Sequence, residues 1–274
     1  MRAPLRGPDF LGVGAHRSGS SWLFRVLSQH PELWLPPVKE LHYFDKPGIH
    51  RTIWSARERR RAKLKGASSP AFWLRYWLGA RDDDWYAALF AAAQRRGLRT
   101  GEITPAYATL PAGVFERMRR RNPALRIVYV MREPIERTWS AVNHAFEKRG
   151  GAPGTLSVAE ALGAARHPSV AARSDYLGTI RRLESVFPRE QIHYGFFEDL
   201  RDAPERFARA LLAFLGVDPK HVREITLPRA VNAAAVASAV PAEFAAELAR
   251  DVRPALRALC ERLGGAPRAW LGVD

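Results

Sequence analysis

The chain has 274 residues, 47% of them hydrophobic and 26% charged, with a formal net charge of +15 and a single cysteine, Cys260. This composition excludes a disordered chain, and the length suits one α/β domain with a sizeable core. One cysteine excludes both an intramolecular disulfide and a cysteine-based zinc site, which fits a reducing compartment.

The sequence has no pattern of a membrane segment. No apolar run approaches the roughly 18 residues that a spanning helix needs. The early apolar stretch from Phe10 to Ala15 is interrupted by glycine and is too short for a signal peptide. We therefore expect a cytoplasmic protein without a transmembrane segment.

The excess of positive charge carries information about binding partners rather than about the fold. It suits nucleic acid, an anionic membrane surface or a polyanionic small molecule, so peripheral membrane contact stays open. It is equally compatible with a compositional bias, because arginine is abundant throughout the chain.

The first predicted element is a short buried strand from Phe10 to Gly14. It leads into a loop over Ala15–Ser20 and a helix over Ser21–Ser28. A short apolar piece at Leu33–Leu35 follows and ends at two prolines. From about Lys46 to Gly97 the chain is rich in arginine and tryptophan and has no strand pattern.

Strand and helix patterns resume after this region. Leu125–Met131 is the clearest buried strand, β-branched and nearly continuous, and a helix begins near Ile135. Two further strands are predicted at 99–102 and 191–197, and helices at 114–121, 176–187, 204–215 and 241–263. Strands that alternate with helices predict an α/β fold. We expect a single P-loop-like domain over residues 1–274, with a central parallel sheet of about five strands flanked by helices.

The first loop has the layout of a phosphate-binding loop. Gly14 and Gly19 lie between the first strand and the first helix. Backbone amides at a helix N-terminus point at an anion, and glycine lets the backbone approach it closely. Alone, such a loop is also compatible with an ordinary strand-to-helix turn.

The residues around the second glycine differ from those of nucleoside triphosphatases, in which a lysine and a Ser/Thr follow the glycine. Here Ser20 and Ser21 follow Gly19, and the basic residue, Arg17, precedes it. The strand that ends at Met131 continues into an arginine rather than into an aspartate that could hold Mg²⁺. The sequence therefore predicts phosphate binding without a metal.

Four segments, in the same order, carry a resemblance to a known family. Residues 15–22 (AHRSGSSW) resemble the 5′-phosphosulfate loop of sulfotransferases that use 3′-phosphoadenosine 5′-phosphosulfate (PAPS). Residues 40–45 (ELHYFD) resemble the segment with the catalytic glutamate in the glycan (heparan-type) branch, and residues 102–107 (EITPAY) resemble a following strand-end motif. Residues 130–140 resemble the 3′-phosphate-binding strand and helix. The resemblance covers about residues 10–216 and is closest to the glycan/heparan-type and bacterial branch.

The resemblance implies a PAPS-dependent sulfotransferase that transfers a sulfuryl group to an acceptor hydroxyl and releases 3′-phosphoadenosine 5′-phosphate. The residues implied in binding the nucleotide fall into three groups. They are the phosphosulfate loop Arg17, Ser18, Gly19, Ser20 and Ser21, the 3′-phosphate pair Arg132 and Ser140, and Trp22. Arg132 and Ser140 would share the crevice in which open α/β sheets bind ligands. Trp22 is placed either to stack on adenine or to fill the core as part of the first helix.

The same resemblance implies Glu40 as the general base, with His42 as the second candidate. Arg17 would stabilise charge on the leaving nucleotide, since an arginine cannot in practice donate a proton. Two plainer interpretations stay open: Glu40 as a surface ion-pair partner of Lys39, and His42 as a structural histidine.

The region from about 46 to 97 is the candidate acceptor side, and the expected acceptor is a carbohydrate or glycolipid. Aromatic rims suit sugar faces or lipid-like molecules, and a hydrophobic helix face is the alternative. The aromatic residues concerned are Trp54, Trp73, Trp77, Trp85, Tyr76 and Tyr86. The six basic residues within 57–65 suit an anionic glycan, nucleic acid or membrane, or a solvated helix.

Two features depart from the family pattern. Ile103 stands where the glycan branch often has a substrate-binding lysine. The late basic loop that clamps the nucleotide is not recognisable, which leaves Arg229 and Asn232 as candidates. Arg126 and Arg137, which flank the 3′-phosphate segment, are predicted to be solvated charges.

Two alternative functions remain. A P-loop kinase or nucleoside triphosphatase is the rival enzyme, and the missing lysine after Gly19 argues against it. A basic nucleic-acid-binding protein would explain the charge but not the ordered phosphate motifs, so we expect no nucleic-acid partner.

Overall fold

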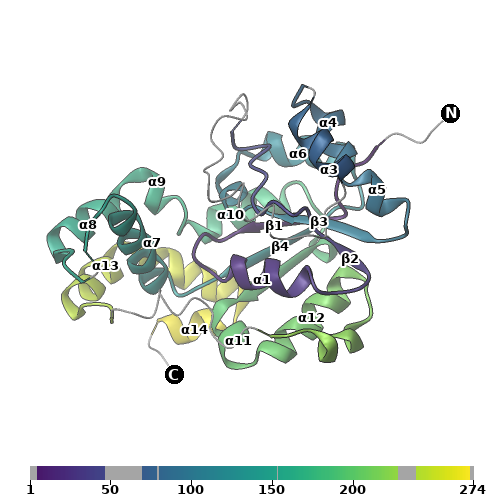
Figure 1. Cartoon of the computed structure of the whole chain (residues 1–274). Helices are drawn as coiled ribbons and strands as arrows, with labels where there is room; N and C mark the ends of the chain where they lie inside the picture. The colour runs from purple at the N-terminus through teal and green to yellow at the C-terminus, as the bar shows by residue number, and fades with distance from the viewer. Residues whose placement is uncertain (1–4, 47–69, 79, 153, 228–238, 272–274) are drawn as a thin grey trace.

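A single five-stranded sheet forms the centre of the protein (Figure 1). The structure, a computed structural model, describes residues 5–46, 70–78, 80–152, 154–227 and 239–271. All strand pairs are parallel, in the order β2-β3-β1-β4-β5. The strands are β1 (Phe10–Gly14), β2 (Leu33–Trp34), β3 (Arg99–Ile103), β4 (Arg126–Met131) and β5 (Ile192–Phe196). The predicted α/β fold with a parallel sheet of about five strands is confirmed.

Helices connect the strands and cover the sheet. In the first half of the chain they are α1 (Ser20–Leu27), α3 (Pro70–Trp77), α4 (Asp83–Ala88), α5 (Ala91–Gln94) and α6 (Ala112–Arg121). In the second half they are α7 (Pro134–Lys148), α8 (Val158–Arg166), α9 (Pro168–Ala171), α10 (Tyr176–Glu184), α11 (Phe197–Asp202), α12 (Pro204–Leu215), α13 (Ala242–Leu263) and α14 (Ala266–Trp270). Within the described ranges, short 3-10 helices are η2 (Pro105–Thr109), η3 (Arg189–Gln191) and η4 (Pro219–Glu224).

The alternation of side chains along the strands builds two cores, one on each face of the sheet. In β4, Val128 and Val130 point into the core with α1 and α12. Their neighbours Ile127, Tyr129 and Met131 point into the core with α6, α10 and α13. Because both faces of β4 are buried, its sequence is apolar throughout, as expected for a strand in the middle of a parallel sheet.

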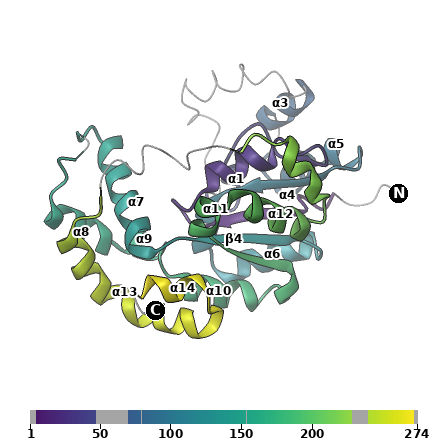
Figure 2. The same cartoon turned by 90° about the horizontal axis from the view of Figure 1, so that it is seen from below.

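The connections after β1 and β4 leave the sheet in opposite directions. The chain goes from β1 through α1 to β2 on one edge, and from β4 through α7 to α10 to β5 on the other edge. Figure 2 shows α13 running alongside α8 and α10, away from α1. The carboxyl ends of β1 and β4 are therefore the point where the topology switches direction, the place where open α/β sheets bind ligands.

The aromatic residues of the predicted acceptor region form a third core. Trp85, Tyr76 and Tyr86 are 7%, 8% and 5% exposed and pack together with the segment from Val38 to Phe44. The hydrophobic-core interpretation therefore holds for these residues, whereas Trp73 and Trp77 are half-buried. Trp54 and the basic run 57–65 lie outside the described residues.

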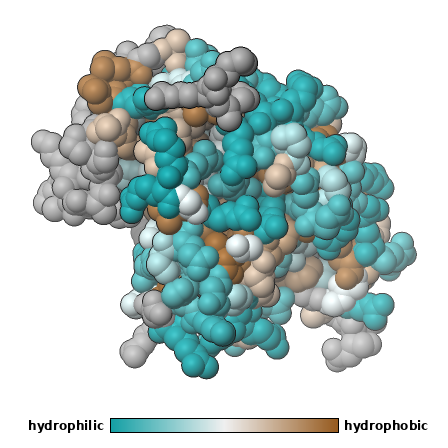
Figure 3. Space-filling model, turned by 90° about the vertical axis from the view of Figure 1, so that its right-hand side faces the viewer, coloured by the Kyte–Doolittle hydropathy of each residue, from teal (hydrophilic) through white to brown (hydrophobic). Residues whose placement is uncertain are grey.

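The surface near this third core has two exposed leucines. Leu74, on α3, is 63% exposed, and Leu78, just after it, is 56% exposed. Figure 3 shows that apolar surface on this side of the molecule gathers near the upper edge, while most of the face is hydrophilic. Among the described residues no helix is long and apolar enough to cross a membrane.

Candidate active site

The phosphate loop is a tight turn tied to the neighbouring strand. The amide of Ala15 donates to the carbonyl of Val130 in β4 (2.6 Å), and the amide of Ser18 donates back to Ala15 (3.3 Å). Gly19 caps α1 with a φ of 86°, a conformation that favours glycine, and a Cβ there would lie 3.0 Å from Leu200. The loop can therefore present its backbone only if residue 19 is glycine.

Helix α1 starts directly after this turn, at Ser20. The amides in the first turn of a helix have no acceptor within the helix, and the helix dipole makes this end positive. Ser20, Ser21 and Trp22 supply those amides, and the two serines add hydroxyl donors. This is the geometry of an anion site.

The residues predicted to bind the two ends of the nucleotide contact each other directly. Arg17, which has a φ of 69°, donates from Nε to Oγ of Ser140 on α7 (2.9 Å) across 123 positions of sequence. Arg132, at the end of β4, donates from Nη1 to the carbonyl of Arg17 (3.4 Å). The structure thus brings together the three side chains that were predicted to grip the two ends of one nucleotide.

The two arginines form an electropositive cluster, in which Glu136 is the ion-pair partner of Arg132. Burial lowers the pKa of Arg17, and the charge of the neighbouring Arg132 lowers it further. The second effect means that the two cations repel each other. Arg132 is 9% exposed; its guanidinium lies 4.5 Å above the ring of Phe197 and pairs with Glu136 one turn along α7 (2.8 Å). An anion bound here would relieve the repulsion, so the cluster fits a phosphate ligand.

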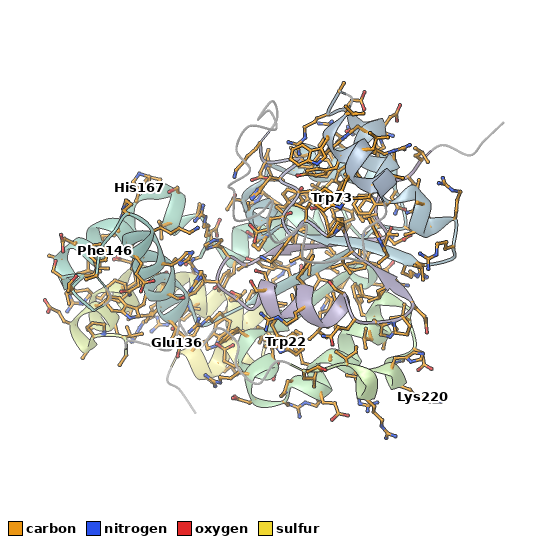
Figure 4. All side chains as sticks on the ribbon, in the orientation of Figure 1. Trp22, Trp73, Glu136, Phe146, His167 and Lys220 are labelled. Atoms are coloured by element: carbon orange, nitrogen blue, oxygen red, sulfur yellow. The ribbon has the colours of Figure 1, made fainter. Side chains whose placement is uncertain are left out.

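Trp22 lies on the core side of α1. Its ring is 3% exposed and meets Phe207 of α12 edge-on, with centroids 6.1 Å apart. In Figure 4 it lies between α1 and the helices below it, whereas Trp73 lies on the opposite, upper side of the sheet. Of the two interpretations for Trp22, the structure shows the core position, and stacking on adenine stays a prediction.

The segment that follows β2 holds the candidate base in a chain of alternating charges. Lys39 Nζ contacts Oε1 of Glu40, and Nε2 of His42 lies 3.4 Å from Oε2 of the same carboxylate. The other ring nitrogen of His42 pairs with Asp45 (2.8 Å). Glu40 is therefore an ion-pair partner of Lys39, but it also belongs to a larger network of four charged groups.

This network fixes the protonation of its members. Burial raises the pKa of Glu40, but the hydrogen bond from His42 and the charge of Lys39 outweigh it and hold the pKa at about 2. Burial lowers the pKa of His42, but its bonds to Asp45 and Glu40 raise it to about 9. At neutral pH Glu40 is a carboxylate and His42 an imidazolium. Glu40 is thus the one of the two that can accept a proton.

His16 connects the two halves of the site electrostatically. Burial, and then the charge of Arg173, lower the pKa of His16 to about 4, while Glu40 acts in the opposite direction and Arg17 lowers it further. The imidazole is therefore neutral at pH 7. The charges of both Arg17 and Glu40 therefore act on this imidazole.

Two arginines differ from the sequence prediction of solvated charge. Arg137 is 0% exposed: its Nε donates to Ser174 (2.9 Å) and its Nη2 to Thr138 (2.9 Å), and burial lowers its pKa. Arg126 is half-buried and donates to the carbonyl of Phe214. Both predictions are wrong, because Phe214 near the end of α12 and Ser174 just before α10 provide oxygen acceptors that a single sequence does not reveal.

The sequence analysis also missed acidic partners of the site. Asp45 orients His42, and Glu136 pairs with Arg132. The four-residue spacing of Arg132 and Glu136 at the start of a predicted helix was an available signal. Arg229 and Asn232, the candidates for a late clamp on the nucleotide, lie outside the described residues.

Comparisons with known proteins agree with this geometry. The model of the sulfotransferase family matches residues 8–221. A sulfotransferase structure from Alicyclobacillus acidocaldarius is 26% identical, with a TM-score of 0.64, and the alignment covers 97% of this chain and 96% of that one. No curated protein matches the sequence.

Two more distant structures have the same fold. The sulfotransferase domain of the Synechococcus PCC 7002 olefin synthase is 18% identical (TM-score 0.54), covering 92% of this chain and 97% of that one. Mouse sulfotransferase SULT7A1, solved in complex with PAP, is 14% identical (TM-score 0.53), covering 96% and 88%. With the family model matching more than half of its length, the chain belongs to the sulfotransferase family.

Proposed function

We propose that this protein is a PAPS-dependent sulfotransferase that transfers a sulfuryl group to an acceptor hydroxyl, with Glu40 as the general base. The observation that supports it most directly is the cluster of Arg17, Arg132 and Ser140 beside the first turn of α1. That cluster joins two groups of hydrogen-bond donors suited to anions, at the carboxyl ends of β1 and β4. A donor nucleotide with phosphate groups at both ends needs both features, and the mouse relative solved with PAP supports this choice.

In the proposed complex, the loop amides and the hydroxyls of Ser20 and Ser21 bind the 5′-phosphosulfate. Arg132 and Ser140 bind the 3′-phosphate as charge-assisted hydrogen-bond donors. When bound, the nucleotide supplies an activated sulfuryl group. The buried, partly uncompensated charge of the two arginines is the physical reason why a doubly anionic ligand fits.

Two side chains of the protein, Glu40 and Arg17, carry separate parts of the proposed reaction. The acceptor oxygen forms a bond to sulfur, the bond from sulfur to the bridging oxygen breaks, and the leaving nucleotide keeps that electron pair. Glu40 accepts the proton of the acceptor hydroxyl, and Arg17 stabilises the negative charge that builds on the bridging oxygen. His42, held as imidazolium by Asp45, keeps Glu40 ionised.

For the acceptor we propose a hydroxyl of a carbohydrate or glycolipid, bound on the side of α3, α4 and α5. The support is the resemblance of residues 40–45 to the glycan branch and the position of this segment against the third core. The basic surface suits an acceptor that carries negative charge.

A thermal-shift comparison tests the proposed donor. The bisphosphate product should raise the melting temperature, whereas ATP with Mg²⁺ and duplex DNA should have little effect. Stabilisation by ATP–Mg²⁺ without stabilisation by the bisphosphate would favour a kinase, and stabilisation by DNA alone would favour a nucleic-acid-binding protein. PAPS-dependent sulfation assays with chito-oligosaccharides, glycolipids and phenols then identify the acceptor class.

A further inference from the structure

A buried carboxylate lies behind the base segment. Glu102, at the end of β3, is 1% exposed and accepts four hydrogen bonds, two on each oxygen. Tyr86 and Tyr107 (3.0 Å) donate to Oε1. The hydroxyl of Thr104 (2.9 Å) and the amide of Leu41 (3.2 Å) donate to Oε2.

Glu102 reaches the backbone on either side of His42, directly at Leu41 and through Tyr107 at Tyr43. Besides the bond from the Leu41 amide to Glu102, the amide of Tyr43 donates to the hydroxyl of Tyr107 (3.0 Å), which itself donates to Glu102. The carbonyl of Leu41 is also held, by Arg81 (3.1 Å). Alternate residues of the segment are therefore fixed to groups at the carboxyl end of β3.

The residues between these fixed points have costly backbone conformations. Glu40 has a φ of 65° and His42 a φ of 51°, in the left-handed region that non-glycine residues avoid. Such conformations persist when the surroundings over-determine them, and they cluster at functional sites. Leu41 and Tyr43, 2% and 7% exposed, are turned into the third core, while Glu40 and His42 stay partly accessible.

We propose that Glu102 is a positioning residue for the base: its carboxylate, with Tyr107, fixes the backbone amides of Leu41 and Tyr43 and so aims Glu40 at the acceptor hydroxyl. The step from position to catalysis rests on the proposed function of Glu40. Glu102 does not itself touch the reacting atoms. It acts as a hydrogen-bond acceptor that the loop backbone cannot replace, because a buried amide without an acceptor is strongly unfavourable.

Variants at residue 102 give a graded test. E102M removes all four acceptor contacts at similar size. E102Q keeps one oxygen for the Leu41 amide, while the tyrosine hydroxyls can rotate to accept from its NH2 group. We expect kcat to fall about 100-fold or more in E102M and to recover in part in E102Q. The affinity for 3′-phosphoadenosine 5′-phosphate should stay within about twofold of that of the wild type in both.

A double variant separates positioning from a general loss of structure. If Glu102 acts through Glu40, E40Q/E102M should have the same kcat as E40Q alone, whereas independent roles would multiply the two losses. The matched control is D9L, because Asp9 is a buried carboxylate at the amino end of β1, the opposite end of the strands from Glu102, and accepts from the amide (2.8 Å) and hydroxyl (3.0 Å) of Thr100. D9L should lower the melting temperature and keep kcat near that of the wild type.

Amide hydrogen exchange tests the positioning without any turnover. Exchange of residues 40–44 should rise at least tenfold in E102M and stay at the wild-type rate in D9L. If E102M does not fold, Y107F, which removes the acceptor of the Tyr43 amide and one of the four donors to Glu102, should raise the exchange of the Tyr43 amide and cause a smaller loss of kcat.

The outcomes distinguish the two proposals. A wild-type protein that neither binds the bisphosphate nor sulfates any acceptor overturns the proposed function, while the exchange rates still decide whether Glu102 fixes the segment. If the wild type is active and E102M has the same kcat and the same exchange rates as the wild type, the proposed role of Glu102 is overturned and the proposed function is not. If the two losses of kcat multiply in E40Q/E102M, Glu102 does not act through Glu40.

Discussion

The two halves of the site differ in their balance of charge. On the nucleotide side Arg132 pairs with Glu136, whereas Arg17 donates to the neutral hydroxyl of Ser140 and is repelled by Arg132, so its positive charge is available to a ligand. On the base side Lys39 and His42 alternate with Glu40 and Asp45, two cations against two anions. The first half is arranged to bind an anion, and the second to keep one particular carboxylate ionised.

The largest effect is expected from E40Q, which removes the proposed base and leaves the residues proposed to bind the nucleotide unchanged. Loss of general-base catalysis lowers kcat by about 10²–10⁴-fold. The affinity for the bisphosphate, measured by calorimetry, should not change. Turnover near the wild-type value would remove Glu40 as the base.

R132A is the opposite experiment, because it removes a residue proposed to bind the nucleotide and leaves the proposed base unchanged. A hydrogen bond to a charged group contributes about 1.5–3 kcal/mol, so binding of the bisphosphate should weaken about 10- to 100-fold. The control is R117A, since Arg117 pairs with Asp83 on α4 and lies outside the nucleotide cluster. Equal affinities in R132A and the wild type would contradict the assignment of Arg132.

A variant of His42 tests the charge balance of the base side, because it removes one of the two cations there. Glu40 must be unprotonated, so activity is lost as the pH falls through the pKa of Glu40, about 2 in the wild type. Without the hydrogen bond from His42 this pKa rises, and the acid limb of the kcat profile should move to higher pH in H42A. K39M should move it in the same direction. An acid limb at the same pH in all three proteins would rule out the charge network as its cause.

The smallest effect concerns stability at alkaline pH. The pKa of His42 is raised from 6.5 to about 9 on folding, so its charge stabilises the fold fully below about pH 6.5 and ceases to do so as the pH rises through about 9. The difference in melting temperature between the wild type and H42A should therefore shrink over that interval. A difference that stays constant from pH 6 to 10 would contradict the raised pKa.

The sequence predicted the fold and the nucleotide side better than the base side. Strand β4 was recognisable because a strand buried on both faces is continuously apolar, and Gly19 because a left-handed cap before a helix favours glycine. Arg17, Arg132 and Ser140 were expected together, since loops at the carboxyl ends of neighbouring parallel strands meet in one crevice.

What the sequence did not show were contacts between segments distant in the chain. The bond from Leu41 to Glu102 joins positions 61 apart, and that from Arg137 to Ser174 joins positions 37 apart. Neither pair has a local spacing that predicts it. Trp85 and Tyr86 were similarly ambiguous, because an aromatic residue on a short helix suits a core as well as a ligand rim.

The proximity of Arg17 and Arg132 has a consequence for the energetics of the protein. Folding alone brings their two guanidinium groups together, so the fold carries an unfavourable electrostatic contribution that an anionic ligand would remove. A ligand that binds only the folded state at 100 times its Kd stabilises it by about 2.7 kcal/mol. Storage buffers that contain sulfate or phosphate should therefore extend the lifetime of the purified enzyme, and extensive desalting should shorten it.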